Sequence, residues 1–195
     1  MSVIRVDPAS IRQYAGAAQT QFDAIRSELQ GLVSDTVNAR YFGPNAVGFK
    51  TKCGEMASDL STKIGRDLSQ IADAVRSSTT AIATSLGGAP ISIAVNPAPV
   101  PVPAVPAGDG SVEIDTSGLD ALKPAIARHI TTITGQLASH LRNLQGTDWQ
   151  GQAKDSAVAA VGGFTTAATG SAGDAQQAIT GYIDAQINNV MAMDH

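Results

Sequence analysis

The chain has 195 residues, a formal net charge of −4 and only 4% aromatic residues. A net negative charge argues against nucleic-acid binding, which needs a clustered basic surface. Few aromatic and many small residues favour closely packed helices over a bulky globular interior, and no run of about 18 apolar residues is present to predict a membrane span.

The N-terminal residues lack the apolar core of a secretory signal peptide. If the protein leaves the cell, we therefore expect it to do so without a cleaved leader. Cys53 is the only cysteine, so no internal disulfide can form, and we expect it to be a small buried apolar residue.

Residues 1–86 are predicted to form one long helical hairpin. Asp7-Pro8 is a strong helix start, because Asp caps free N–H groups and Pro is tolerated at the first helical position. Apolar residues then recur at steps of three and four until about Asn38, and Gly43-Pro44 predicts a tight reversal. A second stripe of the same spacing runs from Phe49 to Ile82.

Residues 87–111 differ entirely from the hairpin. Between Asn96 and Pro106 proline stands at nearly every second position and no residue is charged, which favours an extended polyproline II linker. An SH3-type PxxP ligand is the alternative, although no flanking Arg or Lys is present to orient it. Some 25 such residues reach roughly 75 Å. That length spans a helix of about 60 Å and so permits two antiparallel hairpins packed as an all-α four-helix bundle.

Residues 112–195 are predicted to repeat the hairpin, with the reversal at Trp149-Gln150-Gly151 and a last helix to about Asn189. Pro124 interrupts the first stripe of this half, so we expect the regular helix to start near Asp120 or to kink at the proline. The last helix is rich in glycine, each costing roughly 0.5–1 kcal/mol against alanine. We expect tight packing on another helix to compensate at these positions, which are Gly162, Gly163, Gly170, Gly173 and Gly181.

The two halves are an internal repeat without gaps. Gly43 and Gly151 lie 108 positions apart, as do the capping residues Asp7 and Asp115, and the apolar residues keep the same register. We therefore expect the two hairpins to pair within one chain, although exchange between two chains also fits the linker. The predicted pairing seam comprises Ile11, Phe22, Ile25, Leu29, Ile126, Ile130, Ile133 and Leu137.

The repeat resembles a tandem of the WXG family, the small helical hairpins of type VII secretion in actinobacteria and firmicutes. Trp149-Gln150-Gly151 is a literal Trp-x-Gly at a predicted helical reversal, and Tyr41-Phe42-Gly43 is its degenerate counterpart. The resemblance covers both halves and leaves out only the linker. It implies antiparallel hairpins, which in relatives usually come from two separate chains and here are fused. From the residues alone, the glycine permits the turn, and the aromatic ring covers the bundle end with its N–H or O–H in the turn.

The resemblance also implies a composite export signal, in which a Trp-x-Gly turn combines with a C-terminal motif on the partner hairpin. That motif has Tyr followed four residues later by Asp or Glu. Its degenerate candidate here is Tyr182, with Gln186 at the acidic position, and it lies in the same hairpin as the Trp-x-Gly. Tyr182 as an ordinary bundle residue is the alternative.

No catalytic constellation is apparent, and we expect neither an enzyme nor a bound metal or cofactor. His129 and His140 would lie about 16 Å apart on one helix, too far to share a metal. His140 matches Leu32 in the first half, which predicts a histidine at the bundle edge; a pH-sensitive contact is the sharper alternative.

These features predict a type VII secretion-associated protein that is exported as a unit or carries another protein. Its partners would be the secretion machinery or a co-secreted cargo, with no role for nucleic acid or membrane insertion. We therefore expect a secreted protein. A cytoplasmic protein-binding module and a structural helical protein remain the alternatives.

Overall fold

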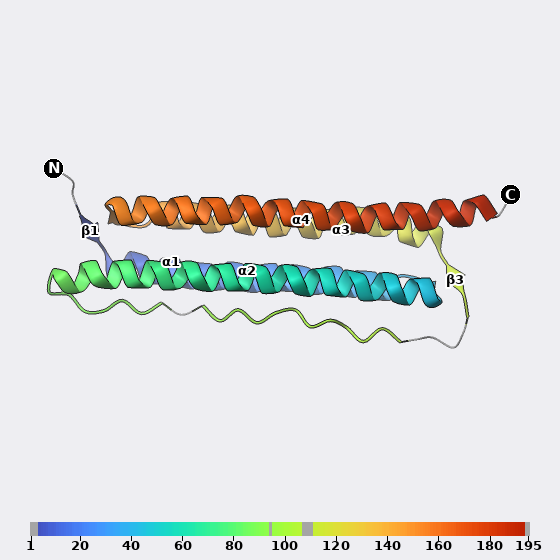
Figure 1. The fold of residues 1–195 in the computed structure, drawn as a ribbon, viewed down its shortest axis with the longest axis horizontal. Coiled ribbons are helices and arrows are strands. Elements are labelled where there is room, and N and C mark those ends of the chain that lie inside the picture. The colour runs from blue at the N-terminus through green and yellow to red at the C-terminus, as the bar shows by residue number, and fades with distance from the viewer. Residues whose placement is uncertain (1–3, 94, 107–110, 194–195) are drawn as a thin grey trace.

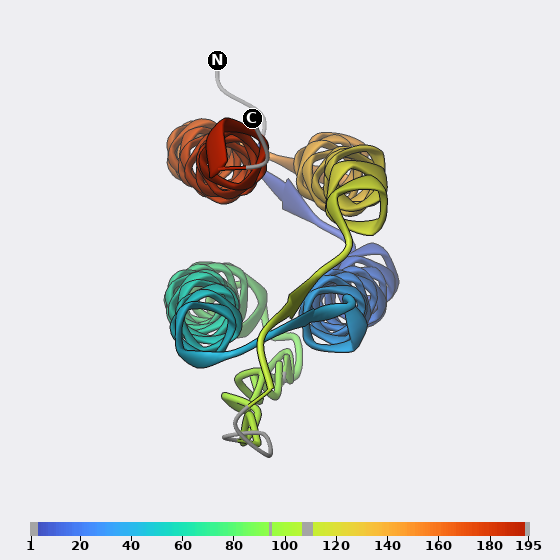
Figure 2. The same cartoon turned by 90° about the vertical axis from the view of Figure 1, so that its right-hand side faces the viewer.

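The computed structural model describes residues 4–93, 95–106 and 111–193. Four long helices, α1 (Pro8–Asn38), α2 (Pro44–Ser85), α3 (Thr116–Gln145) and α4 (Gln152–Met193), form two hairpins. The hairpins lie antiparallel along one long axis (Figure 1), and seen from the end the helices occupy the four corners of a bundle (Figure 2). The predicted all-α four-helix bundle is confirmed.

Four two-residue strands tie each hairpin to the turn of the other. Strand β1 (Arg5–Val6) pairs with β4 (Trp149–Gln150), and β3 (Glu113–Ile114) pairs with β2 (Tyr41–Phe42). These strands are not among the elements that the sequence predicts. Such short bridges leave no alternating pattern in a sequence, because they arise only once the two hairpins lie side by side.

The helix starts follow from local residue chemistry. The Asp7 carboxylate accepts from Ala9 N at 3.1 Å, and the Asp115 carboxylate accepts from Gly118 N at 2.9 Å. At the turns, Gly43 and Gly151 have φ values of 113° and 118°, which only glycine adopts without strain.

Pro124 does not delay the start of its helix, so the first of the two predicted alternatives, a start near Asp120, is wrong. Helix α3 begins at Thr116 and includes Pro124. Only the carbonyl of Asp120 loses its usual donor there. Both residues are exposed, so water can reach that carbonyl.

The core is the predicted apolar seam. Each of the eight seam residues is at most 5% exposed. Seven of them belong to one large cluster that includes residues of all four helices, and Ile11 belongs to a second cluster around Trp149. Burial of apolar surface contributes about 25 cal/mol per Å². The burial of these side chains therefore holds the two hairpins together.

The proline-rich linker lies against the first hairpin. We call residues 87–93 and 95–106 the strap. It runs back along α2 in an extended path on the outer side of α1 and α2 (Figures 1 and 2), as the predicted reach of the linker requires. Thr80 Oγ1 both donates to Ile91 O at 3.2 Å and accepts from Ile91 N at 3.1 Å. Gln19 Oε1 accepts from Asn96 N at 2.8 Å, and Val100 is 1% exposed.

The glycines of α4 are not packed as we expected. A Cβ atom built on any of the five would meet no other atom within 4 Å, apart from its own chain neighbours and helix backbone. Close helix contact therefore does not explain them. Among the described residues, no helix is long and apolar enough to span a membrane.

Candidate functional site

The two ends of the bundle carry the two copies of the turn motif, and they differ in what surrounds the aromatic residue. At one end Tyr41 and Phe42 form β2 and are bonded to β3. At the other end Trp149 and Gln150 form β4 and are bonded to β1. Each end is completed by a long helix of the other hairpin, so any site there belongs to both repeats.

At the Tyr41 end, aromatic and polar contacts join the first turn to α4. The Tyr41 hydroxyl donates to Gln186 Oε1 at 2.9 Å. The Tyr182 ring stacks on Phe49, with centroids 4.8 Å apart and ring planes within 2°. The Tyr182 hydroxyl also reaches the carbonyl of Asn45 at 3.4 Å. The structure thus brings Tyr182 and Gln186 against the Tyr-Phe-Gly turn of the other hairpin.

Burial shapes the electrostatics of this end. The Tyr41 side chain is buried, and burial, followed by the nearby Tyr182 hydroxyl, raises the pKa of Tyr41 to about 12. The Lys50 ammonium donates to the carbonyl of Ala39 at 3.0 Å and lies 5.1 Å from the centre of the Phe42 ring. Burial lowers the pKa of Lys50.

An open groove of about 610 Å³ lies beside these contacts, between the β2–β3 pair and the end of α4. Its walls are largely apolar, and two of its side chains face solvent, since Phe42 is 42% and Val112 is 78% exposed. Its polar groups include the Gln186 and Asn189 amides. Such an apolar groove with a few polar groups suits the binding of a protein segment rather than a reaction.

The Trp149 end carries a smaller open pocket, of about 240 Å³, between the start of α1 and the turn that precedes Trp149. Trp149 is fully buried, and its ring Nε1 has no hydrogen-bond partner among the described residues. The expectation that the ring N–H bonds within its own turn is therefore wrong, and the Tyr41 hydroxyl likewise bonds to α4 and not to its turn. On α2, Ala74 and Ser78 stand at the repeat positions of Tyr182 and Gln186.

The predicted turn residues therefore divide between two sites. Tyr41, Phe42 and Gly43 come together with the degenerate C-terminal pair, whereas Trp149, Gln150 and Gly151 lie at the far end of the bundle. Sequence reasoning missed Phe49, on which Tyr182 stacks. The only signal was an aromatic residue at a position where the second repeat has Ala157.

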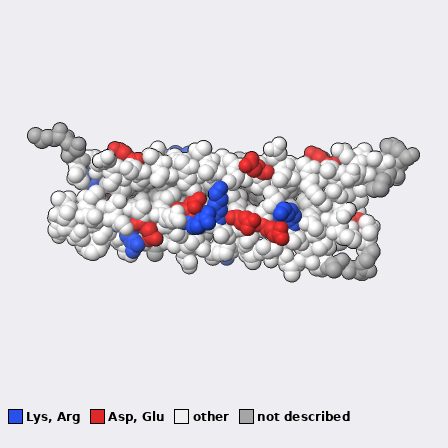
Figure 3. Space-filling view, viewed as in Figure 1, with Lys and Arg blue, Asp and Glu red and all other residues white. Residues whose placement is uncertain are grey.

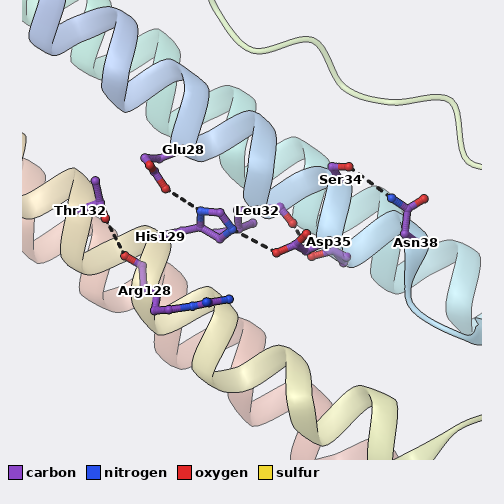
Figure 4. Close-up of polar contacts among 9 residues, drawn as sticks. Glu28, Leu32, Ser34, Asp35, Asn38, Arg128, His129 and Thr132 are labelled. Atoms are coloured by element: carbon purple, nitrogen blue, oxygen red, sulfur yellow. Dashed lines mark hydrogen bonds and ion pairs between the residues drawn. The ribbon is translucent and has the colours of Figure 1, made fainter.

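A polar clasp between the hairpins was also missed. The two ring nitrogens of His129 on α3 face two carboxylates of α1, Glu28 at 2.7 Å and Asp35 at 3.1 Å (Figure 4). The imidazole sits over Gly31, where an added Cβ would lie 2.7 Å from a ring carbon. The clasp links α1 to α3 through two polar contacts, and glycine at position 31 leaves room for the imidazole ring.

His140 is not at the bundle edge, contrary to expectation, but is 3% exposed. Its Nε2 lies 3.3 Å from the Tyr14 hydroxyl, and its Nδ1 has no hydrogen-bond partner among the described residues. Burial lowers the pKa of His140 to about 4. The neutral imidazole thus fills a position that is Leu32 in the first repeat.

Comparison of the chain with protein-family models, with curated proteins and with solved structures finds no match.

Proposed function

We propose that this protein is a non-enzymatic, type VII secretion-associated protein in which two WXG-like hairpins are fused. It is exported as a unit or carries a second protein. The observation that carries the proposal is the meeting of Tyr182 and Gln186 with the Tyr-Phe-Gly turn of the other hairpin. In the family that the sequence resembles, an export signal is composed in this way from two hairpins.

The groove at the Tyr41 end supports recognition by a protein partner. Phe42 and Val112 offer apolar surface that no described part of the chain covers fully, and the Gln186 and Asn189 amides supply directional polar contacts. The groove is formed by both hairpins, so a partner that binds it distinguishes the folded bundle from either hairpin alone.

One observation favours a second candidate function, a protein-binding module that stays inside the cell. Gln186 is a neutral amide where the family motif has an acidic residue, and its oxygen already accepts from Tyr41. In this alternative the same groove binds a cytoplasmic partner.

The deciding experiment measures the protein in culture filtrate and in cell lysate of its native host, with and without the type VII motor ATPase. We expect motor-dependent appearance in the filtrate. Phe42→Ser and Tyr182→Leu should then reduce export, because both alter the groove end. The matched control is Leu86→Ser, which also removes an exposed apolar side chain. Leu86 is 72% exposed and follows the end of α2, away from the Tyr-Phe-Gly turn.

Retention of the wild-type protein in the lysate of cells with a working secretion system would overturn the secretion proposal. In that case a photoreactive amino acid at position 42 would identify the cytoplasmic partner. Equal loss of export in the Leu86→Ser control would show that export does not specifically require the groove.

A further inference from the structure

The strap shows how this fold holds an extended proline-rich chain. Two glycines of α2 let proline rings approach the helix backbone: an added Cβ on Gly54 would lie 2.6 Å from Pro103 Cδ, and one on Gly65 would lie 2.6 Å from Pro97 Cβ. Between them the Ser61 hydroxyl accepts from Val100 N at 2.9 Å. Glycine, hydroxyl and glycine thus form the binding face of α2.

The spacing of these contacts follows from helix geometry. Gly54 and Gly65 are eleven residues apart, which is about 17 Å along an α-helix. Pro97 and Pro103 are six residues apart, which is about 19 Å in polyproline II. With three residues per turn, both prolines and Val100 project from the same side of the strap. The face therefore selects an extended chain with prolines six positions apart.

The same arrangement recurs on α4 without an occupant. The repeat offset of 108 places Gly162, Thr169 and Gly173 at the positions of the α2 face, and both glycines are identical. Added Cβ atoms on Gly162 and Gly173 would meet nothing within 4 Å. In the end view the strap covers the α1–α2 side, whereas no described segment covers the equivalent α3–α4 side (Figure 2).

A further observation concerns the charge of α4. Residues 156–173 carry no charge, like the strap itself. The flank of α4 that faces the viewer in Figure 3 likewise shows only isolated charged residues. Helical glycines reduce stability by about 0.5–1 kcal/mol each, and no contact within the bundle accounts for them here.

We propose that the outer face of α4 around Gly162, Thr169 and Gly173 binds an uncharged, proline-rich extended segment of another protein. Two prolines six residues apart lie over the glycines, and a backbone N–H between them donates to the Thr169 hydroxyl. The match is not complete at its edge, because Gln19, which binds the strap from α1, corresponds to Ala127. The proposal does not depend on export of the protein.

The probe is a neutral synthetic peptide with the sequence of residues 95–106, end-blocked, titrated into the full-length ¹⁵N-labelled protein. We expect saturable amide shift changes at Gly162, Thr169 and Gly173. No change is expected on α2, where the chain's own strap occupies the face. A peptide with proline in place of Val100 lacks the central N–H, and it should bind about fivefold more weakly.

Alanine variants test the face itself. Gly162→Ala with Gly173→Ala should abolish the shifts, because each Cβ occupies the space that a proline ring needs. The matched control, Gly163→Ala with Gly181→Ala, should bind as the wild type does. Around the helix Gly163 lies about 100° from Gly162, and Gly181 lies about 80° from Gly173. All four substitutions fill open space, so both proteins should fold.

Three results would overturn the proposal. The first is the absence of amide shift changes on α4 at the highest peptide concentration that stays in solution. The second is unchanged peptide binding by the Gly162→Ala, Gly173→Ala protein. The third is a concentration-dependent shift of the same amides without peptide, which would identify the occupant as a second copy of this chain.

Discussion

His140 is the residue whose ionisation couples most directly to folding. It is 3% exposed, it contacts the Tyr14 hydroxyl, and burial lowers its pKa to about 4 while raising the pKa of Tyr14. In the unfolded chain a histidine has a pKa of about 6.5. The unfolded state therefore binds a proton more readily than the folded state between these two values.

The stability that His140 contributes is fully present above about pH 6.5 and is lost as the pH falls toward 4. We expect this residue alone to lower the free energy of unfolding by about 2–3 kcal/mol between pH 7 and pH 4. Urea unfolding followed by circular dichroism across that range measures the slope.

The control for this prediction is His140→Leu, which copies Leu32 of the first repeat. The variant should lose the part of the slope that His140 supplies and keep the parts due to other groups. An identical pH dependence in both proteins would contradict a buried neutral imidazole.

At the scale of single elements, α2 and α4 carry glycines at the same repeat positions with opposite consequences. Gly65→Ala should destabilise the bundle, because the new Cβ would lie 2.6 Å from Pro97 and would push the strap away. Gly173→Ala should stabilise it by about 0.5–1 kcal/mol, since the Cβ enters open space and the unfolded chain loses entropy.

Thermal unfolding of the two single variants measures whether stability falls in Gly65→Ala and rises in Gly173→Ala. The comparison is matched, because the same substitution is made at the same repeat position. A gain of stability in Gly65→Ala would mean that the strap adds little to the fold and moves aside at low cost.

The elements also show what a sequence pattern can and cannot predict. The hairpins, their reversals and the helix-capping Asp7 and Asp115 follow from local signals. The position of Pro124 inside α3 does not, because its cost depends on whether water reaches the freed carbonyl of Asp120. The packing of the strap on Gly54 and Gly65 was also beyond local signals, since proline spacing predicts an extended chain and not the surface that it covers.

For the whole molecule, the internal repeat and the reach of the linker were sufficient to predict an antiparallel bundle. They were not sufficient for the candidate site. The contact of Tyr41 with Gln186 joins residues 145 positions apart, and it exists only because each hairpin's turn meets the end of the other hairpin's second helix. The burial of His140 likewise depends on how closely α1 lies against α3.

Cooperative folding of the whole molecule is tested at Leu137, which is 1% exposed in the cluster that also contains Cys53 of the other hairpin. Leu137→Asp buries an unpaired charge in the seam, which costs several kcal/mol, so both hairpins should lose helicity together. Cys53, whose pKa burial raises to about 12, should then become reactive toward a thiol reagent.

Loss of helicity by circular dichroism and the rate of Cys53 labelling are measured on the same sample. Thr131→Asp, at an exposed position of the same helix, is the control and should leave both unchanged. Melting of one half while Cys53 stays protected would contradict a single cooperative unit.

The two unlike ends give this rod a direction. A repeat of two similar hairpins would by itself produce a symmetric object with interchangeable ends. Here one end bears a groove of about 610 Å³ beside the exposed Phe42, whereas at the other end Trp149 is fully buried and the pocket is smaller, about 240 Å³. The ends are separated by the length of α4, whose 42 residues extend about 60 Å. A partner that binds the groove therefore always contacts the same end of the molecule, and the Trp149 end points away from that partner.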